Sequence, residues 1–208
     1  ACEAVHFLLK VLEKTLGRKI RFPKRKMRSI EEFLEVFPDI KDVFLDGTER
    51  RIQRPKKKKN QTKQYSGKKK TTTRKNVILA SERGEILYIS PTKAGRRHDK
   101  RVADKEILVE HIPKSVGIWT DTGFKGIESK HPNVCMPKKG SKLKPLTLEE
   151  KRENTLISSI RVKAEHAIGG MKRFRSMIDT LRNRLGIFDD QIVGIAAGLW
   201  NYHLSYRT

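Results

Sequence analysis

A strongly basic block in the middle of the chain constrains the fold most, because such a block cannot join a hydrophobic core. Residues 50–75 contain 13 Lys or Arg and no Asp or Glu. The block lies between two apolar segments, so we expect it to project from a body that the flanking sequence builds. A solvated loop without a partner is the simpler alternative, since runs of like charge are often disordered.

The whole chain shares this excess of positive charge. Its 208 residues include 47 Lys+Arg and 24 Asp+Glu, which gives a formal net charge of +23. An excess of this size favours a polyanionic partner: nucleic acid, an anionic membrane or an acidic protein. The basic block has no amphipathic helical pattern, and no apolar run approaches the roughly 18 residues of a membrane span, so a membrane partner is disfavoured. We therefore expect a soluble protein that binds nucleic acid.

The two cysteines indicate the compartment. Cys2 and Cys135 lie far apart and outside any spacing typical of a zinc site or a disulfide framework. A reducing, cytoplasmic compartment fits this pattern best.

Alternating β-rich and helical segments predict the fold class. The predicted strands cover residues 43–45, 76–80, 85–90, 116–120 and 133–136. The predicted helices cover residues 4–16, 29–37, 101–111, about 147–177 with a possible break at Gly169-Gly170, and 189–203. The first three strands form a three-stranded antiparallel meander. This order predicts an α/β fold in which a mixed sheet is flanked by helices.

Two predicted strands lead directly into an aspartate, Asp46 and Asp121. In open α/β sheets the binding crevice lies beyond the carboxyl ends of the strands, where two carboxylates can share a hard cation. On the long helix, Arg161, Glu165 and Lys172 lie along one edge of the apolar stripe, at about 100° per residue. Two Asp and one Glu favour Mg²⁺ or Mn²⁺, and two such ions promote in-line attack on a phosphodiester. On pattern alone, a turn aspartate and an exposed helical glutamate stay open as alternatives.

Several short motifs occur in a fixed order along the chain. They are Asp46-Gly47-Thr48, Tyr65-Ser66-Gly67-Lys68-Lys69-Lys70, Gly95 with His98-Asp99, Asp121-Thr122-Gly123-Phe124, and Arg161-x3-Glu165-x6-Lys172. In this order they resemble the DDE transposases of the insertion-sequence-five group and their Harbinger-like relatives, over about residues 40–178. The resemblance implies a ribonuclease H-like fold and metal-dependent DNA cleavage and strand transfer of a mobile element.

The resemblance also implies roles for individual residues. Asp46, Asp121 and Glu165 would be the catalytic triad and the ligands of two Mg²⁺ or Mn²⁺ ions, while Arg161 and Lys172 would hold DNA phosphates. The clustered lysines would neutralise phosphates without reading sequence, namely Lys56, Lys57, Lys58, Lys59, Lys68, Lys69 and Lys70. We expect Asp99, which follows His98, to cap the next helix instead of joining the site.

Domain organisation and partners follow from the same resemblance. Residues 1–38 would be a helical remnant of a helix-turn-helix DNA-binding region, and residues 39–208 the ribonuclease H-like DDE catalytic domain. The partners would be double-stranded DNA at element ends and target, and a homo-oligomer on DNA is possible. In a bacterium the protein would associate with the nucleoid. A catalytically inactive, transposase-derived DNA-binding protein and a basic RNA-binding protein are the alternatives, and the second leaves the acidic motifs unexplained.

Overall fold

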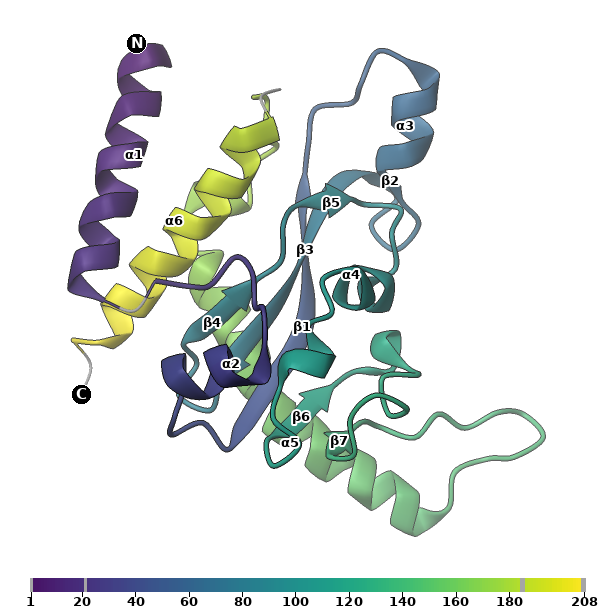
Figure 1. Ribbon diagram of the computed structural model, residues 1–208. Helices are drawn as coiled ribbons and strands as arrows, with labels where there is room; N and C mark the ends of the chain where they lie inside the picture. Colours follow the sequence, from purple (N-terminus) through teal and green to yellow (C-terminus); the bar gives the residue numbers. More distant parts are fainter. Residues whose placement is uncertain (1, 21, 184–185, 207–208) are drawn as a thin grey trace.

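The computed structural model describes residues 2–20, 22–183 and 186–206 and confirms the α/β fold class (Figure 1). The strands are β1 (Asp42–Arg51), β2 (Tyr65–Ser66), β3 (Thr71–Ser81), β4 (Ile86–Ile89), β5 (Lys93–Ala94), β6 (Gly117–Thr120) and β7 (Val134–Cys135). The α-helices are α1 (Cys2–Lys19), α2 (Ile30–Val36), α3 (Lys58–Gln64), α4 (Asp99–Lys105), α5 (Leu148–Met171) and α6 (Gly186–Leu204). Short 3₁₀ helices are η1 (Val109–His111), η2 (Thr122–Phe124) and η3 (Arg175–Met177).

The sheet is built around β1. The strand order is β2-β3-β1-β6-β7, and β4 and β5 also pair with β3. β1 is antiparallel to β3 and parallel to β6, and β3 is antiparallel to β4. The predicted three-stranded meander is therefore present, and the curled mixed sheet flanked by helices is consistent with a ribonuclease H-like fold.

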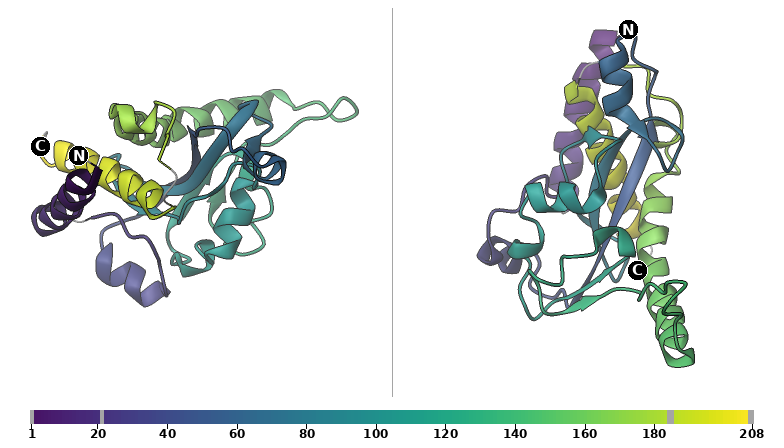
Figure 2. Two further views of the ribbon diagram at one scale, coloured as in Figure 1. Left: turned by 90° about the horizontal axis from the view of Figure 1, so that it is seen from above. Right: turned by 90° about the vertical axis from the view of Figure 1, so that its right-hand side faces the viewer.

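Both faces of the sheet are apolar, because successive side chains of a strand point to opposite faces. Leu45 and Leu79 pack with Val102 of α4 in one buried cluster. Phe44 and Ile78, the neighbours of those residues in the chain, pack with α5 and α6 in the other cluster. Figure 2 (left) shows α5 on one side of the sheet and α2 and α4 on the other.

A buried ion pair joins the sheet to the last helix. Arg50 of β1 is only 1% exposed, and its Nη1 lies 3.1 Å from Oδ1 of Asp189 in α6. Arg74 of β3 approaches the other oxygen of that carboxylate at 2.9 Å. Arg50 also donates a hydrogen bond to the side-chain oxygen of Asn76. Because a buried charge without a partner is strongly destabilising, this network fixes the start of α6 against β1 and β3.

The basic block does not project as a single loop, so that expectation was wrong. Its first and last residues, Arg50 and Lys75, are buried in β1 and β3. Lys75 lies 3.2 Å from a carboxylate oxygen of Glu49 and 3.0 Å from one of Asp99. Only the middle of the block, with the unpredicted helix α3, extends from the sheet (Figure 1). Most of the acidic residues that pair with Arg50 and Lys75 lie far away in the sequence. The basic block therefore contains no sign of these ion pairs.

Two helices end earlier than predicted. The segment 101–111 is helical only as far as Lys105, and Ile107, with φ of 52°, lies in the left-handed region that interrupts a right-handed helix before η1. α5 ends at Met171, and Lys172 is its C-cap residue. α5 also passes through Gly169 and Gly170 without the predicted break.

The first half of α5 leaves the core. Leu156, an apolar residue of this half, is 61% exposed. The buried part of the stripe begins at Ala164. The reason is length: the helix extends past the edge of the sheet, as Figure 1 shows, so its first turns have no apolar surface to cover.

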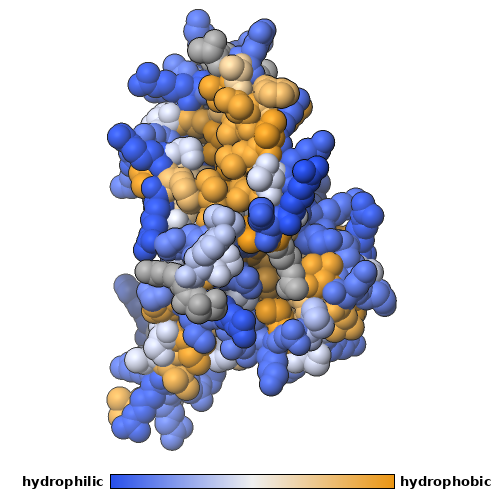
Figure 3. Space-filling view, turned by 90° about the vertical axis from the view of Figure 1, so that its left-hand side faces the viewer, coloured by the Kyte–Doolittle hydropathy of each residue, from blue (hydrophilic) through white to orange (hydrophobic). Residues whose placement is uncertain are grey.

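α1 packs on α6 through one face. Leu16 of α1 is buried, whereas four apolar residues of the helix stay exposed, namely Val5, Phe7, Leu8 and Val11. Figure 3 shows an apolar patch on this side of the molecule. The division into domains at residue 38 stays a prediction. Within the described ranges, no helix combines the length and the apolarity that a membrane crossing requires.

The paired glycines of α5 generate a matched test of packing. A Cβ at Gly170 would lie 2.3 Å from the Trp200 ring, whereas one at Gly169 would meet nothing within 4 Å. We expect Gly170→Ala to lower the free energy of unfolding by about 1–2 kcal/mol, since overpacking outweighs the gain in helix propensity. Gly169→Ala should raise it by about 0.5–1 kcal/mol. Urea unfolding of both variants checks this, and equal effects would contradict the Gly170–Trp200 contact.

Candidate active site

The register of two strands brings Asp46 and Asp121 to the same place. Leu45 of β1 pairs with Thr120 of β6 in parallel, and the two aspartates are the next residues. One pair earlier, the Phe44 and Trp119 rings stack with centroids 6.4 Å apart. Because side chains alternate along a strand, Asp46 and Asp121 face the same side of the sheet as these two rings, which is the side that α5 covers.

Asp46 does not end its strand, contrary to prediction. β1 continues for five more residues to Arg51, paired with β3, while its pairing with β6 stops at Leu45. Asp46 therefore lies where β6 diverges from a longer central strand. The sequence suggested an end because Gly47 interrupts the apolar run.

α5 lies over this part of the sheet. Lys163 places its ammonium 5.9 Å from the centroid of the Phe44 ring, and Ala164 packs in the same buried cluster as Phe44. Asp46 interacts electrostatically with both Arg161 and Lys172. Glu165 lies between these two cations on the same helix, one turn after Arg161.

Burial raises the pKa of Asp46 above its ordinary value. The neighbouring carboxylates of Asp121 and Asp99 raise it further. A hydrogen bond from the Gly47 N–H to Oδ1, at 2.7 Å, and the charge of Arg161 act in the opposite direction. The balance leaves a carboxylate that is costly to ionise without an additional cation.

Asp121 is fixed by the turn that follows β6. Its Oδ1 accepts a hydrogen bond from the Gly123 N–H at 2.9 Å, which makes Asp121 the N-cap of η2. A Cβ at position 123 would lie 2.9 Å from that oxygen, so glycine allows this close approach. The Asp-Thr-Gly sequence thereby holds the carboxylate at the edge of the paired region.

The third predicted ligand is placed differently. Glu165 is exposed on α5. Within the described ranges, no three or more His, Cys, Asp or Glu side chains are grouped closely enough to hold a metal ion. The aspartates nevertheless fit a hard divalent cation, because their oxygens are the donors it prefers and its charge would relieve the repulsion between Asp46 and Asp121. The structure brings two of the three predicted carboxylates together.

Asp99 does not cap α4, so that prediction was wrong. His98 is the N-cap residue and forms no cap hydrogen bond through its side chain, while Asp99 is the first residue of the helix and pairs with Lys75 at 3.0 Å. The Asp99 carboxylate lies against Gly47, where a Cβ would be 2.7 Å from its Cγ. Asp99 thus approaches β1 from the face opposite Asp46. The only sign of this contact in the sequence is the glycine beside Asp46, which leaves room for the carboxylate.

The predicted phosphate-binding residues fall into two groups. Lys68 and Lys69, in the turn between β2 and β3, interact electrostatically with Lys172. Burial and these two charges lower the pKa of Lys172, while Asp46 and Glu49 act against that change. The second group lies apart, in and before the first turn of α3, where all four side chains are exposed: Lys56, Lys57, Lys58 and Lys59.

Comparison with known proteins agrees with this geometry. Residues 45–201, most of the chain, match the family model described as the DDE superfamily endonuclease. The chain belongs to the DDE superfamily of endonucleases. This DDE endonuclease is 28% identical over 207 residues to the probable transposase for insertion sequence element IS702 of Microchaete diplosiphon, across 99% of this chain and 70% of that protein. No solved structure matches it significantly.

Family membership settles part of what the motifs predicted. It confirms the DDE resemblance, whereas the insertion-sequence-five subgroup stays a prediction. It also makes the chain a nuclease that depends on a divalent metal ion.

The raised pKa of Asp46 predicts a pH-dependent gain in stability for Asp46→Asn. The pKa of Asp46 in the folded state lies above its unfolded value of about 3.9. Above the folded-state pKa the carboxyl group is ionised and lowers the free energy of unfolding, whereas below both pKa values it is protonated and has no such effect. Without divalent ions, we expect Asp46→Asn to melt a few degrees above the wild type at pH 7.5. The gap should close as the pH falls toward 4, as measured by calorimetry.

Asp39→Asn is the matched control, because Asp39 is exposed and lies outside the site. It should melt with the wild type at both pH values. A gap for Asp46→Asn that is the same at pH 4 and pH 7.5 would contradict the repulsion described above.

Proposed function

We propose that this DDE endonuclease is the transposase of an insertion sequence, cutting double-stranded DNA at the element's ends and joining the freed ends to a target. The observation that carries the proposal is the placement of Asp46 and Asp121 as neighbours beneath α5, the helix that also bears Glu165. The relative named as a probable transposase, matched across nearly the whole of this chain, supports it.

Asp46, Asp121 and Glu165 are the proposed ligands of Mg²⁺ or Mn²⁺, in a site for two ions. When bound, such ions activate the attacking oxygen and stabilise the leaving oxygen of an in-line displacement. The raised pKa of Asp46 supports this assignment, since a site that is costly to ionise when empty gains most from a cation.

The proposed reaction has two displacements at phosphorus. In the first, water attacks a phosphodiester, the bond from phosphorus to the 3′ oxygen breaks, and the 3′ oxygen takes up a proton. In the second, the freed 3′-hydroxyl attacks a phosphodiester of the target, loses its proton and displaces a target 3′ oxygen. Neither step changes an oxidation state. The protein therefore acts by positioning the reacting groups and by stabilising the charge that develops on them.

Arg161, Lys172 and the turn lysines are the proposed phosphate contacts. Lys172 is half-buried next to Lys68 and Lys69, and like charges held together favour an anion between them. Lys70, in the same turn, extends this surface toward Lys58 of α3. These contacts position the DNA backbone without reading its sequence.

Several finer assignments belong to the same proposal. Residues 1–38 act in DNA recognition, residues 39–208 perform catalysis, and the protein assembles as a homo-oligomer on paired DNA ends. In a bacterial host it would associate with the nucleoid.

Nicking of DNA tests the catalytic assignment. A supercoiled plasmid carrying the genomic flanks of the coding region serves as the substrate, with Mg²⁺ or Mn²⁺. We expect Asp46→Asn, Asp121→Asn and Glu165→Gln each to lower the nicking rate by at least about 100-fold, because each removes a ligand charge at the reacting centre.

Glu153→Gln is the control for Glu165, since Glu153 is an exposed carboxylate on the same helix. If Glu165→Gln nicks DNA at the wild-type rate while both aspartate variants are inactive, Glu165 is not part of the site. A wild-type protein that binds the DNA and never nicks it would favour the inactive DNA-binding alternative.

The salt dependence of binding tests the phosphate contacts. Lys172→Gln should weaken duplex binding to all sequences alike and reduce the slope of log K against log salt by about 1, as expected for one lost phosphate contact. Fluorescence anisotropy at several salt concentrations measures the slope. Lys114→Gln, which removes an exposed charge from the segment before β6, at the end of that strand away from Asp121, should leave the slope unchanged. An unchanged slope for Lys172→Gln would remove Lys172 from the DNA contacts.

A further inference from the structure

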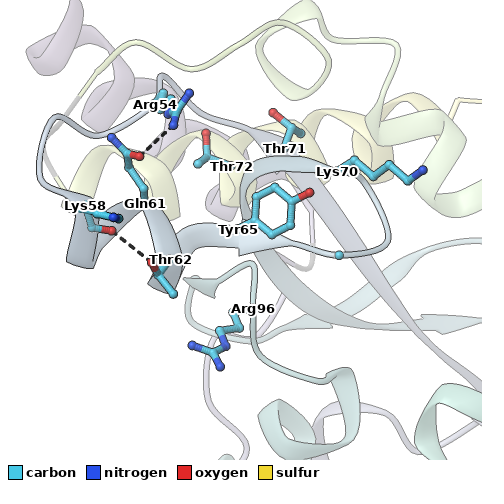
Figure 4. Close-up of a pocket in the computed structure, with 10 residues that line it drawn as sticks. Arg54, Lys58, Gln61, Thr62, Tyr65, Lys70, Thr71, Thr72 and Arg96 are labelled. Carbon is cyan, nitrogen blue, oxygen red and sulfur yellow. Dashed lines mark hydrogen bonds between the residues drawn. The ribbon is translucent and has the colours of Figure 1, made fainter.

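A cavity of about 690 Å³ lies between α3 and the turn that joins β2 to β3 (Figure 4). Four basic side chains line it, namely Arg54, Lys58, Lys70 and Arg96. In the described part of the chain, no Asp or Glu lines this cavity and none of the four forms an ion pair. A concave surface with this lining attracts a phosphate-bearing ligand.

An exposed aromatic ring occupies the middle of this cavity. Tyr65 is 46% exposed, and Figure 4 shows it at the centre of the lining residues, between Lys70 and Thr62. Among the described residues, its side chain forms no hydrogen bond and its ring stacks on no other ring. Exposed aromatic rings beside basic residues are the stacking platforms on which proteins hold unpaired bases.

One wall of the cavity is already fixed. Arg54 donates a hydrogen bond to Oε1 of Gln61 at 2.9 Å, and Gln61 donates to the carbonyl oxygen of Pro55 at 2.8 Å. These bonds join the segment before α3 to the helix itself. A ligand that enters the cavity therefore meets a wall that is formed in its absence.

The basic surface continues beyond the cavity. A second hollow shares Thr62 and Arg96 with it and adds Lys59, Lys63, Arg97 and Arg101. Its one acid, Asp104, is already paired with Lys100 and Lys130. The basic residues of the two hollows form a continuous surface. Such a surface fits a DNA strand, which has a phosphate on each side of the bound base, better than it fits a free nucleotide.

Basic residues of one turn extend from the cavity toward the candidate active site. Lys70 lines the cavity, while Lys68 and Lys69 of the same turn interact with Lys172, which in turn interacts with Asp46. Along β3, Tyr65 pairs with Thr72 and Asp46 with Ile78, so about 20 Å of strand separates the two residues, with the basic turn beside them.

We propose that this cavity binds one unpaired nucleotide of a DNA strand, with Tyr65 stacked on its base and Lys58, Lys70 and Arg96 holding the flanking phosphates. The assignment rests on the proposed function, since it supposes that the strand being cut lies next to Asp46. Beyond the proposed function, the assignment gives the protein a site that holds one base where the duplex is locally opened.

Binding to a duplex with one bulged base tests this site. Three labelled duplexes of the same sequence are compared: fully paired, with one bulged adenosine, and with one bulged abasic residue. We expect the wild type to prefer the bulged adenosine by about fivefold or more over the other two duplexes, the scale of one stacked base. Tyr65→Ala should lose this preference and keep its affinity for the paired duplex, whereas Tyr65→Phe should retain the preference.

Control variants separate the site from general DNA binding. Tyr206→Ala removes an exposed tyrosine of the C-terminal segment and should behave as the wild type. Equal binding of all three duplexes by the wild type, or full preference in Tyr65→Ala, would overturn the site and leave the proposed function intact. Free deoxyadenosine monophosphate that competes as well as the bulged duplex would overturn the assignment to a strand. Failure to bind any duplex would contradict the proposed function itself.

Discussion

The ion pair between Arg50 and Asp189 is the interaction on which the arrangement of the molecule depends. Arg50 stands four residues after Asp46 on the central strand, and both side chains face the helices α5 and α6. The start of α6 is fixed there by a charge that has no access to water. α6 in turn packs on α5, where Gly170 lies against Trp200. This chain of contacts helps to hold α5 over the face of the sheet that carries Asp46 and Asp121.

Like charges are crowded at two adjoining places, and the substrate and its metal ions are what would relieve both. Burial and the neighbouring carboxylates of Asp121 and Asp99 raise the pKa of Asp46, while burial and the neighbouring ammonium groups of Lys68 and Lys69 lower the pKa of Lys172. Each cluster is destabilising when empty. A polyanion carrying divalent cations supplies the missing charge of both signs at once. The net charge of +23 is therefore not evenly distributed: acidic residues lie at the candidate site and basic residues lie around it.

Sequence patterns predicted the fold class and the proximity of Asp46 and Asp121, because the apolar runs that mark strands, and the residues that follow them, can be recognised locally. They failed where a partner lies far away in the chain. The run of basic residues does not reveal that Arg50 and Lys75 are buried beside Asp189 and Asp99, which lie far along the chain. The end of α5 was misplaced because apolar residues continue past Met171 into a 3₁₀ turn. Tyr65 belonged to a recognised motif, yet no pattern could show that its ring lies in a cavity walled by Arg96, which is 31 residues away.

Gly47 couples the two sides of the sheet. Its lack of a side chain lets the Asp99 carboxylate approach the central strand from behind, while Asp46, the preceding residue, faces forward. The Asp99 carboxylate adds to the effect of burial and of Asp121 in raising the pKa of Asp46, so charge on α4 acts on the other face of the sheet. A change in α4 that moved Asp99 away would lower the pKa of Asp46. A helix on the opposite face of the sheet therefore takes part in the electrostatics of Asp46.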